Sequence, residues 1–220
     1  MNLNETKNIV IELQYLPCIS YFQSLSQAEE VIIDVGENYE KQSYRNRCRI
    51  LTSHGIQVLS VPIVKAPRKQ PLKDVTIDYD QKWLNVHWRA IYSAYGKAPF
   101  FEYFAEEFKD IYYKKHKYLL DLNLDFLTLC LKSLRRNINY RLSEKYVDLA
   151  ENSFITDLRS KIHPTKELMN EHASAIPEYN QVFGKGFVKN LSIIDLIFCE
   201  GPNANNLLYQ TLKKNAITFT

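Results

Sequence analysis

Two short apolar runs on either side of an amphipathic segment open the chain. Residues 8–14 and 31–35 are rich in Ile, Val and Leu, a pattern typical of buried strands. Between them, residues 19–28 carry Phe22 and Leu25 on one face of a predicted helix. A strand, a helix and a strand within roughly thirty residues predict a βαβ unit with parallel strands. The right-handed crossover rule places its helix on one face of the sheet.

A β-hairpin is predicted next. Residues 44–52 and 57–64 are enriched in β-branched and aromatic side chains, which favour strands. The link between them contains Ser53, His54 and Gly55, and a short connection with Gly is typical of a hairpin.

From residue 81 onward the apolar residues recur at the spacing of a helix face. Gly96 can end the first of these helices, and Pro99 can open the second. We predict helices from 81 to Gly96, over 100–113, over 119–134 and over 204–213, and a further helix that begins within 190–196. Short strands are predicted at 75–77 and 139–142. Residues 160–174 are predicted to form a long loop or a weak helix.

Together these elements predict an α/β fold. The N-terminal βαβ unit and the hairpin are expected to form a mixed sheet, flanked by a mainly helical second half. A chain of 220 residues can form one domain that buries roughly 70% of its unfolded surface. No linker divides the sequence, so we expect a single domain over residues 1–220.

Charge and cysteine content exclude several classes of function. A net charge of +3 is too small, and its Lys and Arg too dispersed, for a nucleic-acid-binding face. The four cysteines are widely and irregularly spaced, which excludes a zinc knuckle and a redox pair. No apolar run approaches the roughly 18 residues of a membrane span, and residues 1–8 lack signal-peptide features. A cytoplasmic protein with reduced thiols is expected.

A polar stretch over residues 37–48 is the first candidate site. It follows the second predicted strand, where an open α/β sheet places its ligand crevice. Arg45 and Arg47 present planar guanidinium groups that suit carboxylate or phosphate. The alternative is a polar loop that leads into an edge strand. Ordinary loops, however, favour small turn-forming residues rather than these long functional side chains.

The second candidate is a helix that carries Trp83, His87 and Tyr95. Residues four apart share a helix face, so Trp83 and His87 point the same way. A histidine can act as a general acid or base near neutral pH. The alternative is a packed histidine whose ring nitrogens are satisfied. The five histidines are scattered, so the sequence predicts no metal site.

Several blocks of the sequence, in this order, resemble the WbqC-like protein family. They cover about residues 9–137, and the combined pattern is far more specific than any single block. The blocks are Tyr15-Leu16-Pro17-Cys18-Ile19-Ser20-Tyr21-Phe22; Asn38-Tyr39 with Lys41 and Asn46-Arg47; Leu59-Ser60-Val61-Pro62; Trp83 and His87 with Ile91, Tyr95, Ala98-Pro99-Phe100-Phe101 and Tyr103; and Asn123.

The start of the pattern departs from the family. Its members commonly open with His-Gln-Pro, whereas this chain has Ile11-Glu12-Leu13. If the family's opening histidine is catalytic, this chain has lost activity, works differently, or uses Glu12.

The resemblance implies a bacterial cytoplasmic protein of O-antigen or other surface-polysaccharide biosynthesis. It favours a transferase that moves an acyl or aminoacyl group onto an amino-sugar or a related amine. The substrate would be a small molecule or sugar nucleotide, no cofactor is indicated, and a homo-oligomer is compatible with the sequence. The alternative is a non-catalytic saccharide-binding or assembly protein of the same pathway.

In the enzyme hypothesis His87 is the general base, and Arg45 and Arg47 hold an anionic donor. The remaining candidate substrate-binding residues are Asn38, Tyr39, Lys41, Asn46, Trp83, Tyr95 and Asn123. This hypothesis requires two parts of the chain to meet around a shared pocket. One is the arginine-bearing segment, which is the stretch 37–48 with Arg45 and Arg47, and the other is the Trp83–His87 helix.

Overall fold

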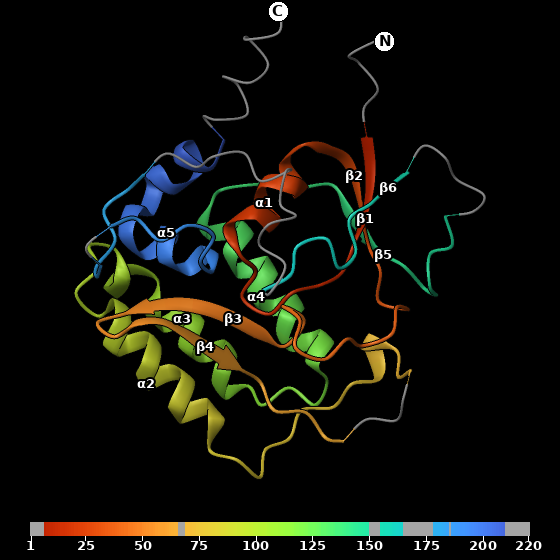
Figure 1. The fold of residues 1–220 in the computed structure, drawn as a ribbon, viewed down its shortest axis with the longest axis horizontal. Coiled ribbons are helices and arrows are strands. Elements are labelled where there is room, and N and C mark those ends of the chain that lie inside the picture. The colour runs from red at the N-terminus through yellow and green to blue at the C-terminus, as the bar shows by residue number, and fades with distance from the viewer. Residues whose placement is uncertain (1–6, 66–68, 150–154, 165–177, 185, 210–220) are drawn as a thin grey trace, which may run out of the picture.

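The computed structural model describes residues 7–65, 69–149, 155–164, 178–184 and 186–209 (Figure 1). These residues include a parallel sheet, an antiparallel hairpin and a set of helices. The predicted α/β class is therefore confirmed. The predicted loop or weak helix over 160–174 lies largely outside the described residues, as does the end of the predicted last helix.

The parallel sheet has four strands in the order β5-β2-β1-β6. All three neighbouring pairs are parallel, and Ile9 of β1 lies opposite Val31 of β2. The predicted βαβ unit and the predicted strand at 139–142 are confirmed. The strand bounds are β1 (Lys7–Ile11), β2 (Ala28–Ile33), β5 (Tyr140–Leu142) and β6 (Ile155–Asp157), and α1 (Ile19–Ser26) joins β1 to β2.

The hairpin consists of β3 (Arg47–Thr52) and β4 (Gly55–Ser60), paired from Arg47 with Ser60 to Thr52 with Gly55. It forms a two-stranded sheet of its own, so the strands do not make the single mixed sheet that was expected. The polar segment 34–46 turns the chain away from β2 before β3 begins, so the two sheets share no ladder. The predicted strand at 75–77 forms only isolated bridges.

Helices fill the second half, as predicted, and pack around one hydrophobic core. α2 packs against β3 and α3, and α4 packs against α3 and α5. Residues 193–199 of α5 are all buried, so this helix lies inside the molecule. The bounds are η1 (Leu72–Asp74), α2 (Trp83–Tyr95), α3 (Phe101–Tyr113), α4 (Leu119–Ser133), α5 (Ile193–Glu200) and η3 (Gly201–Asn203), with a further helix from residue 204.

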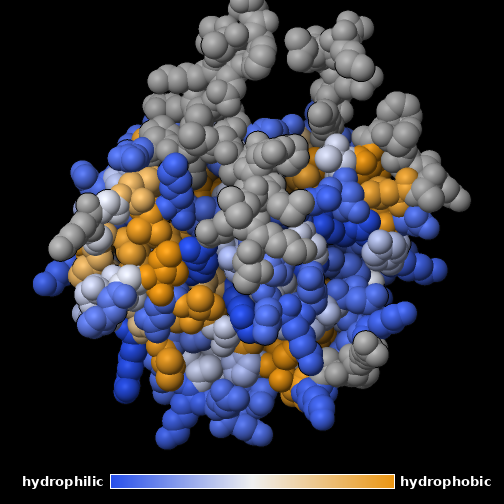
Figure 2. All heavy atoms as spheres, in the orientation of Figure 1, coloured by the Kyte–Doolittle hydropathy of each residue, from blue (hydrophilic) through white to orange (hydrophobic). Residues whose placement is uncertain are grey.

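The surface of the molecule is mainly polar, as expected when most large apolar side chains lie in the core. Figure 2 shows hydrophilic side chains over most of one face, with smaller apolar groups between them. Among the described helices, none has the length and apolar character required to cross a membrane.

Candidate functional site

Polar side chains gather at the carboxyl ends of the parallel strands. Glu12 follows β1, Asp34 follows β2, and Ser160 comes shortly after β6. Because the strands are parallel, these positions meet at one edge of the sheet, where open α/β sheets bind ligands. The buried Glu12 carboxylate accepts hydrogen bonds from Gln14 Nε2 and the Ser160 backbone N–H, each at 2.9 Å.

Asp34 connects three of the four strands at this edge. Its buried carboxylate accepts hydrogen bonds from Ser143 Oγ at 3.0 Å and from Arg159 Nη1 at 2.6 Å. It also accepts the backbone N–H groups of Gly36 and Glu37. Asp34 therefore fixes the start of the polar segment that was predicted as a site.

A buried ion pair lies within that segment. Arg45 donates from Nε and Nη2 to the two carboxylate oxygens of Glu37, each at 2.7 Å. Nη1 of Arg45 reaches Glu40 at 3.3 Å, and Nη2 donates to Ser160 Oγ at 3.0 Å. The Arg45 side chain is only 2% exposed, so its guanidinium is occupied by protein groups.

Glu37 has an unusual protonation equilibrium for a carboxyl group. Burial raises the pKa of Glu37 to about 7, while Arg45 acts in the opposite direction and Glu12 and Asp34 add to the increase. A carboxyl group with a pKa near 7 can accept and return a proton at neutral pH.

The start of β3 is anchored by amide side chains. Asn46 Nδ2 donates to the Val61 carbonyl at 2.8 Å. Asn123, which is buried on α4, donates from Nδ2 to the Arg45 carbonyl at 2.8 Å. Asn123 therefore supports the arginine-bearing segment, although it is almost eighty positions later in the chain.

His87 lies within a buried aromatic cluster on α2. Its Nδ1 hydrogen-bonds the Tyr15 hydroxyl at 2.9 Å, and Tyr15 also bonds the Tyr112 hydroxyl. Trp83 packs edge-on against the imidazole, with ring centroids 5.1 Å apart. Burial lowers the pKa of His87 to about 4, and a hydrogen bond to the Ser60 backbone opposes that shift. The imidazole is therefore neutral at pH 7.

The predicted meeting of the two segments can be followed through Ser60. His87 bonds the Ser60 backbone, and Ser60 pairs with Arg47 across the hairpin. The arginine-bearing segment and the Trp83–His87 helix are therefore neighbours. Four cavities lined by described residues have volumes from about 270 to about 520 Å³, and neither Arg47 nor His87 lines any of these four.

Four buried polar atoms near this junction have no hydrogen-bond partner among the described residues. Two are donors, Arg47 Nε and Trp83 Nε1, and two are acceptors, Asn46 Oδ1 and Asn123 Oδ1. Buried polar groups in native proteins are nearly always paired with protein, water or a ligand. All four residues are among those predicted to bind substrate, and we take them as the centre of the candidate site.

Four other predicted residues are either open to solvent to some degree or lie at the far end of α2. Asn38 and Lys41 are exposed and Tyr39 is half-buried. Tyr95 lies at the far end of α2, where its ring packs 5.4 Å from that of Phe198. The structure therefore separates Tyr95 from His87, although both belong to the same helix.

Sequence analysis missed several polar residues of the site. Asp34 was overlooked because the predicted strand 31–35 included it, whereas β2 ends at Ile33. A carboxylate at the end of a parallel strand is a position that could have identified it. Arg159 and Ser160 follow a strand of only three residues with no clear pattern, so no signal indicated them. Tyr112 was placed only within the predicted helix 100–113. Among the described residues, no group of three or more His, Cys, Asp or Glu side chains is arranged to hold a metal ion.

Residues 14–176 and 165–207 match the WbqC-like protein family, so the match covers most of the chain. The chain belongs to this family. The suspected relationship is confirmed, and the match extends beyond the region of 9–137 in which the resemblance was clearest.

A relative in Mycobacterium tuberculosis (strain ATCC 25618 / H37Rv) is named uncharacterized protein Rv1507c. It is similar to this member of the WbqC-like family, with 27% identity over 227 residues that cover 92% of this chain and 97% of the relative. No solved structure matches the chain.

Proposed function

We propose that this WbqC-like protein is a transferase that moves an acyl or aminoacyl group onto an amino-sugar or a related small amine. The observation that carries the proposal is the group of unpartnered buried atoms on Asn46, Arg47, Trp83 and Asn123. Two donors and two acceptors in one neighbourhood suit a polar substrate with both kinds of group. The buried carboxylates beside these atoms also provide a proton acceptor.

Arg47 is the better candidate for holding an anionic donor. The guanidinium of Arg45 is committed to Glu37, Glu40 and Ser160, whereas Nε of Arg47 has no partner among the described groups. A guanidinium presents donors in a fork that matches carboxylate or phosphate oxygens.

Glu37 is a candidate for the general base, and one of its two hydrogen bonds with Arg45 has to open before it can take the proton. In the proposed reaction the acceptor amine attacks the donor carbonyl, forms a new C–N bond, and gives a proton to the base. The leaving group departs with the electron pair of its bond to the carbonyl carbon. A base works best with a pKa near the operating pH, which favours Glu37 at about 7 over His87 at about 4. His87 then holds Tyr15 and the hairpin in place.

The setting of surface-polysaccharide biosynthesis in a bacterial cytoplasm rests on the family resemblance. The relative Rv1507c is itself uncharacterized by name, so it adds no substrate. The polar chemistry of the site suits a sugar nucleotide or another small hydroxylated metabolite.

Replacing Arg47 with alanine is expected to raise KM for an anionic donor by roughly ten- to a hundredfold, because one charge-assisted hydrogen bond is lost. The measurement is product formation by mass spectrometry from panels of activated acyl and aminoacyl donors with amino-sugar acceptors. Arg141→Ala is the matched control, since Arg141 is exposed and pairs with Glu30 at the sheet edge. Equal effects of both substitutions would contradict the role of Arg47.

A non-catalytic saccharide-binding protein is the second candidate. It is favoured by Ile11, which stands where the family commonly has histidine, and by the low pKa of His87. In this case Arg47→Ala weakens ligand binding measured by calorimetry, and no donor panel yields a product. Detection of any product with the wild-type chain would exclude this candidate.

A further inference from the structure

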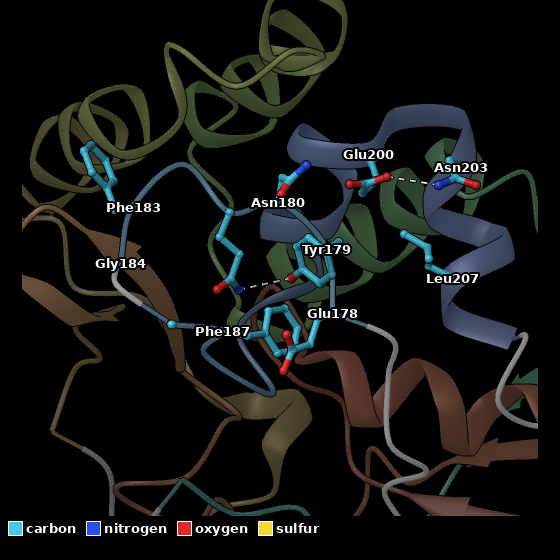
Figure 3. Close-up of a pocket in the computed structure, with 11 residues that line it drawn as sticks. Glu178, Tyr179, Asn180, Phe183, Gly184, Phe187, Glu200, Asn203 and Leu207 are labelled. Carbon is cyan, nitrogen blue, oxygen red and sulfur yellow. Dashed lines mark hydrogen bonds between the residues drawn. The ribbon is translucent and has the colours of Figure 1, made fainter.

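A cavity of about 520 Å³ lies on a different part of the molecule (Figure 3). One wall is the chain over residues 178–184 and 186–187, and the other is the end of α5 with η3. Its volume falls within the range of roughly 300–1,000 Å³ that is typical of small-molecule sites. None of the residues assigned to the candidate functional site lines it.

A buried carboxylate organises the first wall. Asp195 is fully buried in the first turn of α5, and its Oδ2 accepts the Tyr179 hydroxyl at 2.6 Å and Gln181 Nε2 at 3.0 Å. Gln181 also exchanges two hydrogen bonds of 2.9 Å with the backbone of Val188. These bonds tie both ends of the described wall to α5.

The lining combines aromatic rings with acidic and amide side chains. Tyr179 and Phe187 meet edge to face, with ring centroids 5.0 Å apart. Glu178 and Glu200 bring carboxylates to opposite walls, and Asn203 donates to Glu200 at 3.0 Å (Figure 3). Among the described residues that line the cavity, none is Lys or Arg.

We propose that this cavity is a second binding site, for a protonated amine carried on a small hydroxylated body of about one sugar ring. The two carboxylates attract the ammonium group, and amide side chains such as Asn180 and Asn203 suit the hydroxyls. The rings offer an apolar wall and a face that favours cations.

The test uses glucosamine as the probe in titration calorimetry at neutral pH and low salt, with glucose as the uncharged comparison. We expect glucosamine to bind more tightly than glucose. The double substitution Glu178→Gln with Glu200→Gln weakens this binding about five- to tenfold, because the charge is removed while hydrogen-bonding capacity stays. Glu106→Gln on α3 is the matched control, since Glu106 is exposed and outside the cavity.

Arg47→Ala separates this site from the proposed transferase site. Binding of glucosamine that survives Arg47→Ala but is lost in the double variant belongs to the cavity. If glucosamine binds no better than glucose, or if only Arg47→Ala removes its binding, the cavity proposal is overturned and the proposed function is unaffected. Thermal melts check that each variant is folded, and Glu178→Lys, at an exposed position, repeats the test by charge reversal.

Discussion

Replacing Arg45 with alanine is expected to lower the free energy of unfolding by about 3–5 kcal/mol at pH 8, because a buried carboxylate loses its partner. Arg45 is 2% exposed and makes two hydrogen bonds of 2.7 Å to Glu37. The measurement is urea unfolding followed by circular dichroism.

The size of this effect should depend on pH. The pKa of Glu37 is already raised to about 7, and loss of the guanidinium raises it further. At pH 5 the variant keeps Glu37 protonated, so the uncompensated charge disappears and the destabilisation becomes smaller than at pH 8.

Arg141→Ala is the matched control for Arg45→Ala. Arg141 is 57% exposed and pairs with Glu30 at the surface, where an ion pair contributes about 0–1 kcal/mol. A loss in Arg45→Ala no larger than in Arg141→Ala, at every pH, would show that the buried pair does not hold the polar segment.

Local sequence patterns predicted the individual helices and strands better than the way in which the strands pair into sheets. The apolar runs of β1 and β2 and the helical spacing of α2 to α4 follow from neighbouring residues, and the sequence analysis predicted them. The separation into two sheets depends on how Asp34 and Glu37 turn the chain, which involves Ser143 and Arg159 far along the sequence. Strand β6 has only three residues, too few for a pattern.

The candidate site shows the same division. The polar segment 37–48 and the helix of His87 were predicted to meet around a shared pocket. The structure makes them neighbours through Ser60, but neither Arg47 nor His87 lines any of the four described cavities. The pairing of Arg45 with Glu37 was not predicted, because nothing in the sequence distinguishes a buried guanidinium from an exposed one. The family resemblance supplied Asn123, which local patterns alone had assigned to a helix.

His87→Gln is expected to remove a large pH-dependent contribution to stability. In the folded chain the pKa of His87 is about 4, below its ordinary value of 6.5, because burial disfavours the charged ring. The unfolded chain therefore binds a proton between these values that the folded chain does not. The stability that His87 contributes is present above pH 6.5 and is lost as the pH falls towards 4. Between pH 7 and pH 4.5 the loss is about 2–3 kcal/mol.

The contribution of Glu37 to stability changes with pH in the opposite direction to that of His87. The effect of His87 is therefore taken from the difference in stability between wild type and His87→Gln. The pKa of Glu37 is raised from 4.5 to about 7, so its contribution falls as the pH rises through that range. Both chains retain this term, and it cancels in their difference. His54→Gln is the matched control, because His54 lies in the exposed turn between β3 and β4.

Urea unfolding at several pH values between 4.5 and 8 measures the effect. The stability curves of wild type and His54→Gln against pH should be parallel, whereas between pH 7 and pH 4.5 the stability of His87→Gln should rise by about 2–3 kcal/mol relative to theirs. Parallel curves for all three chains would mean that folding does not lower the pKa of His87, so that its ring is protonated in the folded state below about pH 6.5. A protonated ring could not accept the Tyr15 hydroxyl at Nδ1, and His87 would again be the stronger candidate for proton transfer near neutral pH.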